Sequence, residues 1–273
     1  MNIKHFIITR FMNNPNLGFG QRIFDKTVLK ESAVYLNNNL IKSLENQTDK
    51  DFTLIVLIND RHDKEFIESL IDDTYLHILI VKDSELDNVI KQSVDSTCDY
   101  LITTRIDYDD LVVNTAVETC KSKFIRFFKK FNDKMFCVNG FSKGLALVDN
   151  RLYMMDKHYR GGGFFSAFVS LCYNLKLSKT FDCLKNVYSL GDHTNLYGGI
   201  RNLFRYLHVE NSYNDDELEQ FIDREELFEY NYIWYRHKNT GSELLNYTPA
   251  DTSDEISIDK ERFKTLFGIN LEK

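Results

Sequence analysis

The stretch DYLITTRIDYDD, residues 99–110, joins an apolar run to a crowded set of charges. Residues 99–106 are rich in Ile, Thr and Tyr, which favours an extended strand. Three carboxylates, Asp107, Asp109 and Asp110, then fall within four positions, and Arg105 lies just before them. What such a cluster does depends on where its strand stands in the fold.

The chain before this stretch alternates between two kinds of pattern. Short apolar runs predict three earlier strands, at residues 4–11, 52–58 and 76–81. Apolar residues at helical spacing predict helices between them, at residues 24–45, 63–72 and 84–97. Ser84 is the expected N-cap of the last of these helices. The alternation predicts an α/β protein with a doubly wound sheet, in which residues 99–106 form the fourth strand.

Polar residues close three of these strands. They are Thr9-Arg10, Asn59-Asp60 and the segment from Arg105 to Asp110. Ligands of such sheets bind beyond the carboxyl ends of the strands. The sequence therefore predicts that these residues meet at one edge of the sheet and form a binding site.

The remaining chain is less regular. Residues 111–122 have a helical pattern, and residues 123–156 read as strands joined by turns. Gly161, Gly162 and Gly163 form a turn that is expected to open a helix within 160–175, and 185–199 reads as a strand and a loop. Further helices are expected at 215–229 and 257–267.

Bulk composition limits the class of partner. A net charge of -7 and a pI near 5.6 argue against nucleic acid, while a small anionic ligand needs only a few local cations. Five cysteines without a CxxC pair are expected to be reduced thiols. The N-terminus lacks a signal-peptide pattern, and no apolar stretch reaches the roughly 18 residues of a membrane span. We therefore expect a cytoplasmic protein.

The acidic cluster allows several interpretations. It could begin a helix, with Asp107 as N-cap and Asp109 and Asp110 beside the positive end of the dipole. A calcium loop would match Asp107 and Asp109, but Leu111 takes a ligand position and Val112 the place of the required glycine. A phosphatase with an aspartyl nucleophile carries its acidic motif after the first strand, whereas this one follows the fourth.

A fourth interpretation is a divalent cation held by carboxylates and bridging two phosphates of a nucleotide. Carboxylates suit Mg²⁺ and Mn²⁺, which are hard ions. Arg105 would add a charge-assisted contact to the same phosphates. Transfer of a sugar from a nucleotide needs this arrangement, because the departing diphosphate gains negative charge.

The order of motifs resembles that of glycosyltransferases of the GT-A fold. In that fold a turn of the type S(I/L)xxQTxxxF precedes the second strand, here SLENQTDKDF (43–52), and the fourth strand ends in a DxD motif, here within TTRIDYDD. More narrowly, HFIITRF, NQTDKDFT, LITTRIDYDD and the later YSLGDHTNL resemble the rhamnosyltransferase family. The resemblance covers about residues 3–200.

The resemblance implies roles for individual residues. Thr9, Arg10 and Asp60 would contact the nucleotide, with Asp60 accepting a hydrogen bond from the base. Arg105 would contact the diphosphate, and Asp107 the ribose or the metal. Asp109 would be the main ligand of Mn²⁺ or Mg²⁺, completed by His193. The glycines 161–163 would lie near the sugar or acceptor. The acidic motif usual after the glycine turn is missing from RGGGFFSAF. Asp149 and Asp156 are the nearest upstream carboxylates, neither of which stands out, and Asp156 is the expected general base.

From this resemblance we expect a metal-dependent, inverting glycosyltransferase that moves a sugar such as L-rhamnose from a UDP- or dTDP-linked donor to a glycan hydroxyl. Residues 1–200 would form the catalytic domain, with a nucleotide-sugar half to about 110 and an acceptor half over 111–200. Residues 201–273 would be a helical extension packed on it. The basic, aromatic segment RNLFRYLH (201–208) either packs on that domain or lies on an anionic membrane, and the first is favoured. A sugar nucleotidyltransferase and a non-catalytic nucleotide-sugar-binding protein are the alternatives.

Overall fold

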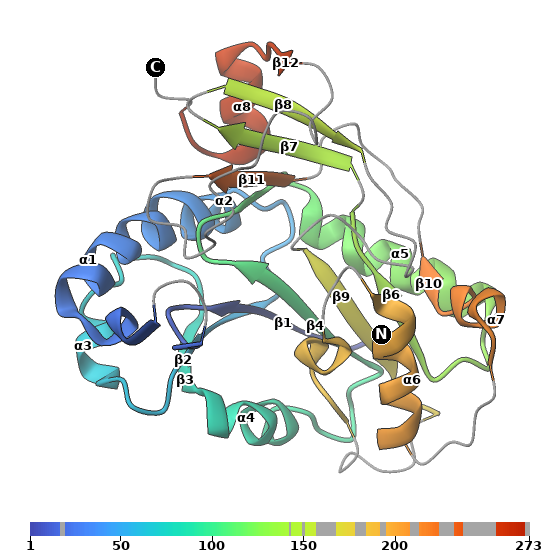
Figure 1. The fold of residues 1–273 in the computed structure, drawn as a ribbon. Coiled ribbons are helices and arrows are strands. Elements are labelled where there is room, and N and C mark those ends of the chain that lie inside the picture. The colour runs from blue at the N-terminus through green and yellow to red at the C-terminus, as the bar shows by residue number, and fades with distance from the viewer. Residues whose placement is uncertain are drawn as a thin grey trace.

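The structure is a computed structural model of the whole chain. It describes residues 1–16, 20–141, 143–148, 151–156, 168–177, 184–191, 195–207, 213–223, 232–236 and 255–270. The fold consists of a large mixed sheet between two layers of helices, with a smaller sheet beside one layer (Figure 1).

The large sheet has seven strands in the order β10-β6-β9-β4-β1-β2-β3. In chain order they are β1 (Ile3–Arg10), β2 (Thr53–Ile58), β3 (Ile78–Lys82), β4 (Tyr100–Asp107), β6 (Phe136–Asn139), β9 (Val169–Asn174) and β10 (Ile222–Asp223). The four strands β1 to β4 pair in parallel, and β9 runs antiparallel between β4 and β6. The four predicted strands and the α/β class are confirmed. Their side chains are buried on both faces, which explains their nearly continuous apolar sequence.

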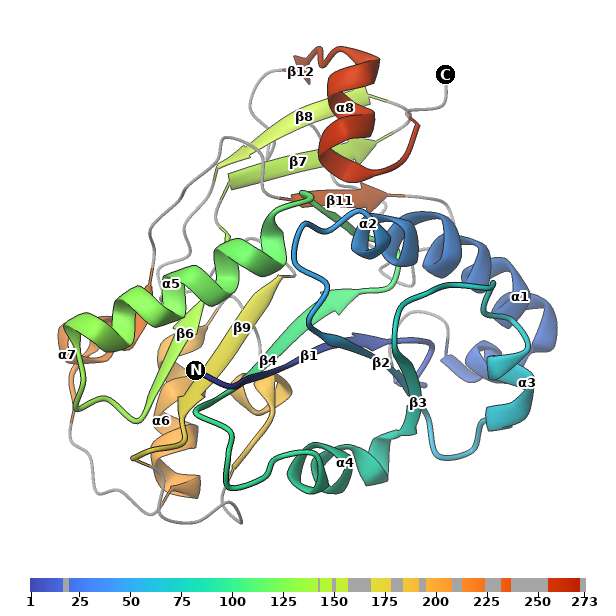
Figure 2. The same ribbon diagram turned by 180° about the vertical axis from the view of Figure 1, so that it is seen from behind.

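The helices lie on both faces of this sheet. They are η1 (Gly20–Phe24), α1 (Lys26–Tyr35), η2 (Leu36–Ile41), α2 (Lys42–Glu45), α3 (Lys64–Glu68), η3 (Asp83–Glu85), α4 (Leu86–Gln92), α5 (Ala116–Lys130), η5 (Val187–Leu190), α6 (Leu196–Tyr206), α7 (Asp215–Glu219) and α8 (Lys260–Phe267). The views from both sides place α1, α2 and α5 on one face and α4 and α6 on the other (Figures 1 and 2).

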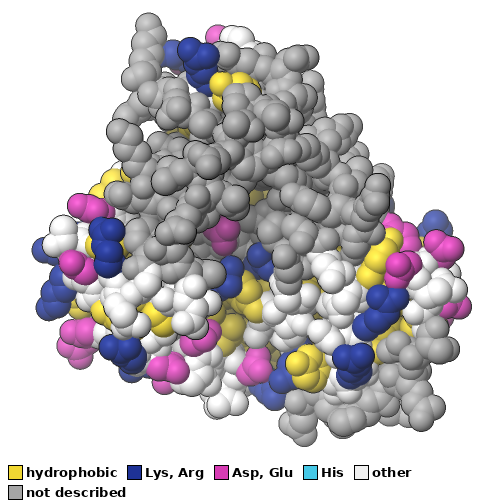
Figure 3. Space-filling view, viewed as in Figure 1, with side chains coloured by type: hydrophobic (Ala, Val, Ile, Leu, Met, Phe, Trp, Pro, Cys, Tyr) yellow, Lys and Arg dark blue, Asp and Glu magenta, His cyan; other side chains and the backbone are white. Residues whose placement is uncertain are grey.

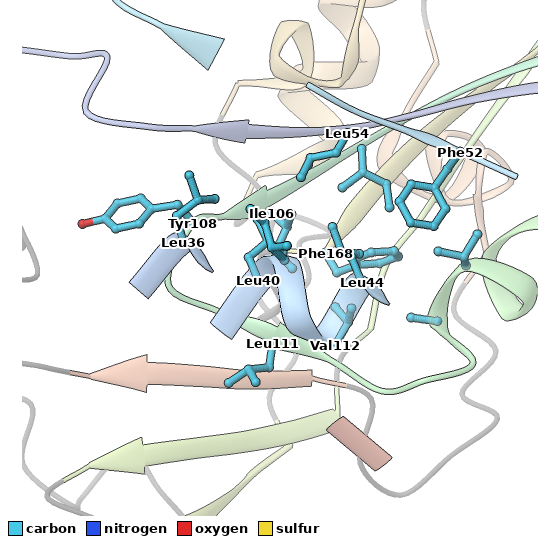
Figure 4. Packing of buried hydrophobic residues seen from close by; sticks show 14 of the residues in the cluster. Leu36, Leu40, Leu44, Phe52, Leu54, Ile106, Tyr108, Leu111, Val112 and Phe168 are labelled. Carbon is cyan, nitrogen blue, oxygen red and sulfur yellow. The ribbon is translucent and has the colours of Figure 1, made fainter. Parts of the chain in front are cut away.

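The large sheet accordingly separates two apolar cores, one on each face. On the α1–α5 face, Leu36, Leu40 and Leu44 repeat at four-residue spacing and pack with Leu54 and Ile106 of the sheet (Figure 4). The second core joins the other face of the sheet to α4, η5 and α6. The sheet is therefore anchored from both sides up to the point where its strands end.

The smaller sheet has the order β12-β8-β7-β11-β5. Its strands are β5 (Leu111–Val112), β7 (Lys143–Val148), β8 (Arg151–Asp156), β11 (Tyr232–Arg236) and β12 (Glu255–Ile256). Strands from beyond residue 200 thus contribute to both sheets. We expected this part of the chain to be helical, whereas it contains β10, β11 and β12 as well as helices. The boundary at residue 200 falls within α6, and the division into domains stays a prediction.

Five expected elements are wrong over all or part of their length. Residues 123–130, expected among strands, belong to α5, and the helix expected over 215–229 ends at Glu219, before β10. Residues 111–122 do not begin a helix, because Leu111 and Val112 form β5 and α5 starts only at Ala116. The helix expected within 160–175 is replaced over its last part by β9, a central strand buried on both faces. The strand expected within 185–199 is replaced by η5 and the start of α6.

Candidate functional site

Arg10 and Asp107 are direct neighbours at the carboxyl edge of the large sheet. The parallel register of β1 and β4 pairs Arg10 with Asp107, the last residue of each strand. Arg105 lies two residues earlier on β4, so its side chain leaves the same face as that of Asp107. The sheet therefore brings two cations and a carboxylate together, as the sequence predicted.

Both guanidinium groups contact one aromatic ring. The centroid of the Tyr188 ring in η5 lies 4.9 Å from Arg10 Cζ and 5.6 Å from Arg105 Cζ. The Tyr188 hydroxyl donates to the carbonyl of Ile8 at 3.2 Å, and Arg105 Nη1 donates to the carbonyl of Gly191 at 2.9 Å. Burial raises the pKa of Tyr188 to about 12, against the opposing effect of the two arginines. Tyr188 is therefore a neutral platform that holds two positive charges side by side.

A cavity of about 480 Å³ opens beside this cluster. Its lining comes from the ends of β1 and β2, from η3 and α4, and from η5: Arg10, Asn13, Asn14, Pro15, Leu57, Asn59, Asp83, Ser84, Leu86, Asp87, Asn186 and Tyr188. Acidic and basic side chains meet at a recess in the centre of this face of the molecule (Figure 3). The cavity thus lies where parallel strands end, as expected for a ligand of this type of sheet.

Asp60 is placed differently from the role that the resemblance implied. Its Oδ1 accepts hydrogen bonds from the Ser84 amide at 3.1 Å and the Ser84 hydroxyl at 2.8 Å. These bonds hold the pKa of Asp60 below its usual value. Ser84 therefore bonds to Asp60. Our prediction that Ser84 caps α4 is wrong. Asp60 is also not among the residues that line the cavity, whereas Asp83 is.

The acidic turn, residues 107–110, is held by η2, which lies on the α1–α5 face of the sheet. Asn39 Nδ2 of η2 donates to the backbone carbonyl of Asp109 at 2.9 Å. Asp109 and Asp110 are 8% and 2% exposed, while Asp107 is half-buried. The helix after this turn begins nine residues beyond Asp107, with Thr115 at its N-cap. The interpretation of the cluster as a helix N-terminus is therefore wrong.

The carboxylates of the turn are the candidate ligands of a divalent cation. Among the described residues, no three His, Cys, Asp or Glu side chains gather closely enough to hold a metal ion. Magnesium-type ions, however, are commonly held by one or two carboxylates together with substrate phosphates and water. Asp107 supplies one such carboxylate next to Arg10. The buried Asp109 carboxylate acts electrostatically on Tyr35 and Tyr108, and its role as a metal ligand stays a prediction.

Among the remaining predicted residues, Thr9 has a described side chain, and it does not line the cavity. Thr9 is fully buried, and within the described part of the chain its hydroxyl has no hydrogen-bond partner. The backbone of Asp156 ends β8 in the smaller sheet, and its side chain is outside the description. His193 and the glycines 161–163 lie outside the described residues. Their roles stay predictions.

Most residues that line the cavity are not among those expected from the sequence, and Asp83 and Tyr188 are two of them. Tyr188 stands in the segment YSLGDHTNL, where the resemblance gives it no role. The position of Asp83 carried a signal, because it directly follows a parallel strand, as Asn59 does. Tyr188 is placed by tertiary packing of η5, which no local pattern indicates.

Comparisons with known proteins give a family. A family model described as "Putative rhamnosyl transferase" matches residues 20–180, more than half of the chain. No curated protein matches the chain in sequence.

Among solved structures, S. aureus TarS 1-349 in complex with UDP-GlcNAc has a TM-score of 0.41 at 12% identity, covering 88% of this chain and 60% of its own. Mouse xyloside xylosyltransferase 1 has a TM-score of 0.38 at 11% identity, and the match covers 82% of this chain and 85% of the mouse protein. The inositol-1-phosphate CTP transferase from T. maritima has a TM-score of 0.36 at 14% identity, and the match covers 75% of this chain and 82% of that protein.

Proposed function

The chain belongs to the rhamnosyl transferase family of glycosyltransferases, and from this premise we propose that it transfers a sugar from a nucleotide-sugar donor to a hydroxyl of a glycan acceptor. The proposed donor is UDP- or dTDP-linked, and the proposed sugar is L-rhamnose. The resulting bond would belong to a polysaccharide under synthesis.

One observation carries the donor half of this proposal. Arg10 and Arg105 lie on one Tyr188 ring, opposite Asp107 and beside a cavity of about 480 Å³. Guanidinium groups match the oxygens of a diphosphate in geometry and charge. A cavity next to them can receive the nucleoside, so a nucleoside diphosphate fits the site as a whole.

The chemistry follows from where the charge develops. The acceptor oxygen forms a bond to the anomeric carbon while the bond from that carbon to the diphosphate oxygen breaks. The nucleoside diphosphate leaves with the electron pair, and Arg10 and Arg105 stabilise its negative charge. The hydroxyl proton passes to a carboxylate, for which we propose Asp156. A single displacement of this kind inverts the anomeric configuration.

We propose Asp107 and Asp109 as the residues that hold Mn²⁺ or Mg²⁺, with His193 as a further ligand. When bound there, the ion would neutralise part of the charge on the leaving diphosphate. Asn39 fixes the backbone of the turn, which sets the position of the Asp109 carboxylate in advance.

The C-terminal region bears on where the protein acts. In the described part of the chain, every helix is too short or too polar to cross a bilayer. α6 buries Leu196, Ile200, Leu203 and Phe204 against the sheet, which leaves few apolar residues for a lipid surface. A peripheral membrane contact and a cytoplasmic location stay predictions.

The proposal is tested by a thermal-shift panel of nucleoside diphosphates, with and without Mn²⁺. Binding to the native state raises the melting temperature, so UDP or dTDP should raise it and Mn²⁺ should increase the effect. Chromatography of a reaction with a nucleotide sugar should then show release of the nucleoside diphosphate. Release of pyrophosphate on forming the sugar nucleotide would indicate a nucleotidyltransferase, and a panel without any shift would refute the donor site.

A further inference from the structure

We propose that the open edge of β3 docks an extended segment of another protein, in which alternating apolar residues are flanked by Lys or Arg at both ends. The docked segment would add a strand to the large sheet beyond β3. This edge lies outside the donor cavity, so the proposal does not depend on the proposed function.

β3 is the outermost strand at one side of the large sheet as described, between α3 and α4 (Figure 2). Its sequence, ILIVK, has no proline, and its one charge belongs to its last residue, Lys82. Proteins usually protect an edge strand with charges, proline, a bulge or a covering element. Extended peptides bind many proteins by adding a strand to an edge that lacks this protection.

The backbone of β3 presents hydrogen-bonding groups at the open edge. The Leu54 amide donates to the carbonyl of His77 at 2.9 Å, and the parallel register pairs Leu54 with Ile78. His77 and the odd-numbered residues after it therefore bond to β2, whereas Ile78 and Ile80 direct their N–H and C=O groups outward. Within the described chain, no strand pairs with these outward groups. The side chains of both residues pack in the core of the α1–α5 face, which holds the edge in place.

A groove of about 650 Å³ follows this edge. β3 lies between two walls, one from α3 and the loop after it and the other from η3 and α4. Ile71, Leu76 and Val89 supply apolar surface to these walls. A docked strand would place alternate side chains on the two sides of β3, so apolar residues in it would find apolar surface.

The charged residues that line the groove are mostly acidic. The one lysine among them, Lys64, lies 3.9 Å from Glu68 and is offset by it. Asp72, Asp73 and Glu85 are exposed, and within the described residues no salt bridge engages them. The first two precede β3 and Glu85 follows it, so the groove is acidic at both ends. A segment with a cation at each end complements this pattern.

A second copy of this chain fits the groove less well. A closed pair of identical chains has a two-fold axis, which would set the two copies of β3 antiparallel. The end that carries Asp72 and Asp73 would then lie against the end of the other copy that carries Glu85. Lys82 does not line the groove and acts on Asp60. Like charges would therefore meet at both ends, which favours a different, basic partner.

The test adds a synthetic peptide to the whole chain and follows amide hydrogen exchange by NMR. In the probe peptide, Val and Thr alternate between a pair of Lys at each end, and in the control peptide every Lys is replaced by Glu. Two further probes carry backbone N-methyl groups, one on every Val and the other on every Thr. Titration calorimetry measures the affinity of each peptide.

We expect the Lys peptide to slow exchange of the Ile78 and Ile80 amides. The amides of Leu79 and Val81 are already bonded to β2, so their exchange should stay unchanged and serves as an internal control. One of the two N-methylated probes should bind and the other should not, because alternate N–H groups of an extended strand point to opposite sides. A peptide held only by its side chains would lose affinity equally in both.

The charge of the groove is tested with Asp73→Lys and Glu85→Lys. Each should weaken binding of the Lys peptide about threefold or more and strengthen binding of the Glu peptide, since an exposed ion pair becomes a repulsion. The control Asp133→Lys makes the same change in an exposed residue of the loop after α5 and should leave both affinities unchanged. Melting temperatures close to that of the wild type would show that the variants are folded.

Several results would overturn the inference. They are no binding of the Lys peptide at millimolar concentration, equal affinities of the Lys and Glu peptides, equal losses in the two N-methylated probes, and no added protection at Ile78 and Ile80. Protection of these two amides that rises with the concentration of the protein alone would assign the edge to a second copy. The donor assays described above use a different surface, so their outcome separates failure of this inference from failure of the proposed function.

Discussion

The contact between α6 and η5 is predicted to depend on one glycine. At Gly199, an added Cβ would lie 2.2 Å from the carbonyl oxygen of Leu190 and 2.8 Å from its Cα. Both neighbours are backbone atoms, so α6 and η5 would have to separate before the methyl group could fit. Because η5 carries Tyr188, the separation would also move the ring that holds Arg10 and Arg105.

The magnitude can be worked from two opposing effects. Overpacking against a fixed neighbour costs about 3 kcal/mol at the upper end of the usual range, and replacing Gly by Ala inside a helix returns about 1 kcal/mol. Gly199→Ala should therefore destabilise the protein by about 2 kcal/mol. For a chain of this size the melting temperature would fall by about 4 to 8 °C.

Gly198→Ala is the matched control. Its Cβ would meet only the side chain of Asn195, at 3.0 to 3.4 Å, and the gain in helix propensity is the same. We expect its melting temperature to stay close to that of the wild type, and UDP binding to be weakened only in Gly199→Ala. Equal melting temperatures for the two variants would refute the close approach of α6 to η5.

Three further predictions concern the carboxylate turn, the arginine pair and the buried histidine. Asp109→Asn should abolish the strengthening of UDP binding by Mn²⁺, while the control Asp133→Asn should keep it. Calorimetric titration of UDP with and without Mn²⁺ measures this effect, and an unchanged effect of Mn²⁺ in Asp109→Asn would contradict the role of Asp109 as a metal ligand. Arg105→Lys should weaken UDP about tenfold or more but leave uridine unaffected, because a point charge replaces a planar fork; equal losses for both ligands would mean a general disturbance of the pocket. Burial lowers the pKa of His5 from 6.5 to about 3, so the stabilising contribution of its neutral form is present above pH 6.5 and is lost as the pH falls toward 3. His5→Gln should accordingly lose about 2 kcal/mol less stability than wild type between about pH 7.5 and pH 5, measured by urea unfolding; parallel pH profiles would contradict this.

The first four strands could be predicted because their pattern is local. Each is a short apolar run between polar residues, as expected for parallel strands covered on both faces. The site followed from the same reasoning, since the carboxyl ends of neighbouring parallel strands lie at one edge. Arg10 and Asp107 are register partners for this reason, although about a hundred residues separate them in sequence.

The errors concern segments whose structure is decided by distant partners. Leu111 and Val112 continue a helical pattern, but they pair with Ile233 and Tyr232 of β11. β9 has the sequence VSLCYN, which reads as well for a buried helix as for a central strand. Its pairing with β4 and β6 on both sides decides for the strand, and neither pairing can be seen in a local window.

The alternation of side chains along β1 explains why only one residue of the pair Thr9-Arg10 reaches the cavity. Phe6 and Ile8 face the core beneath α4 and η5, while Ile7 and Phe11 face the core beneath α1 and α5. With a period of two, Arg10 follows Phe6 and Ile8 toward the cavity, and Thr9 is buried with Ile7.

The same alternation on β4 places Arg105 and Asp107 on one face and Ile106 on the other. Two adjacent strand residues cannot both line one pocket unless the strand bulges or ends between them. The resemblance implied that both Thr9 and Arg10 contact the nucleotide. The two-residue period of β1 turns Arg10 toward the cavity and Thr9 toward the opposite face of the sheet. A Thr9→Val variant, which keeps the shape and removes a buried hydroxyl, should therefore bind UDP as the wild type does, and weakened binding in a protein of unchanged stability would show that Thr9 reaches the ligand.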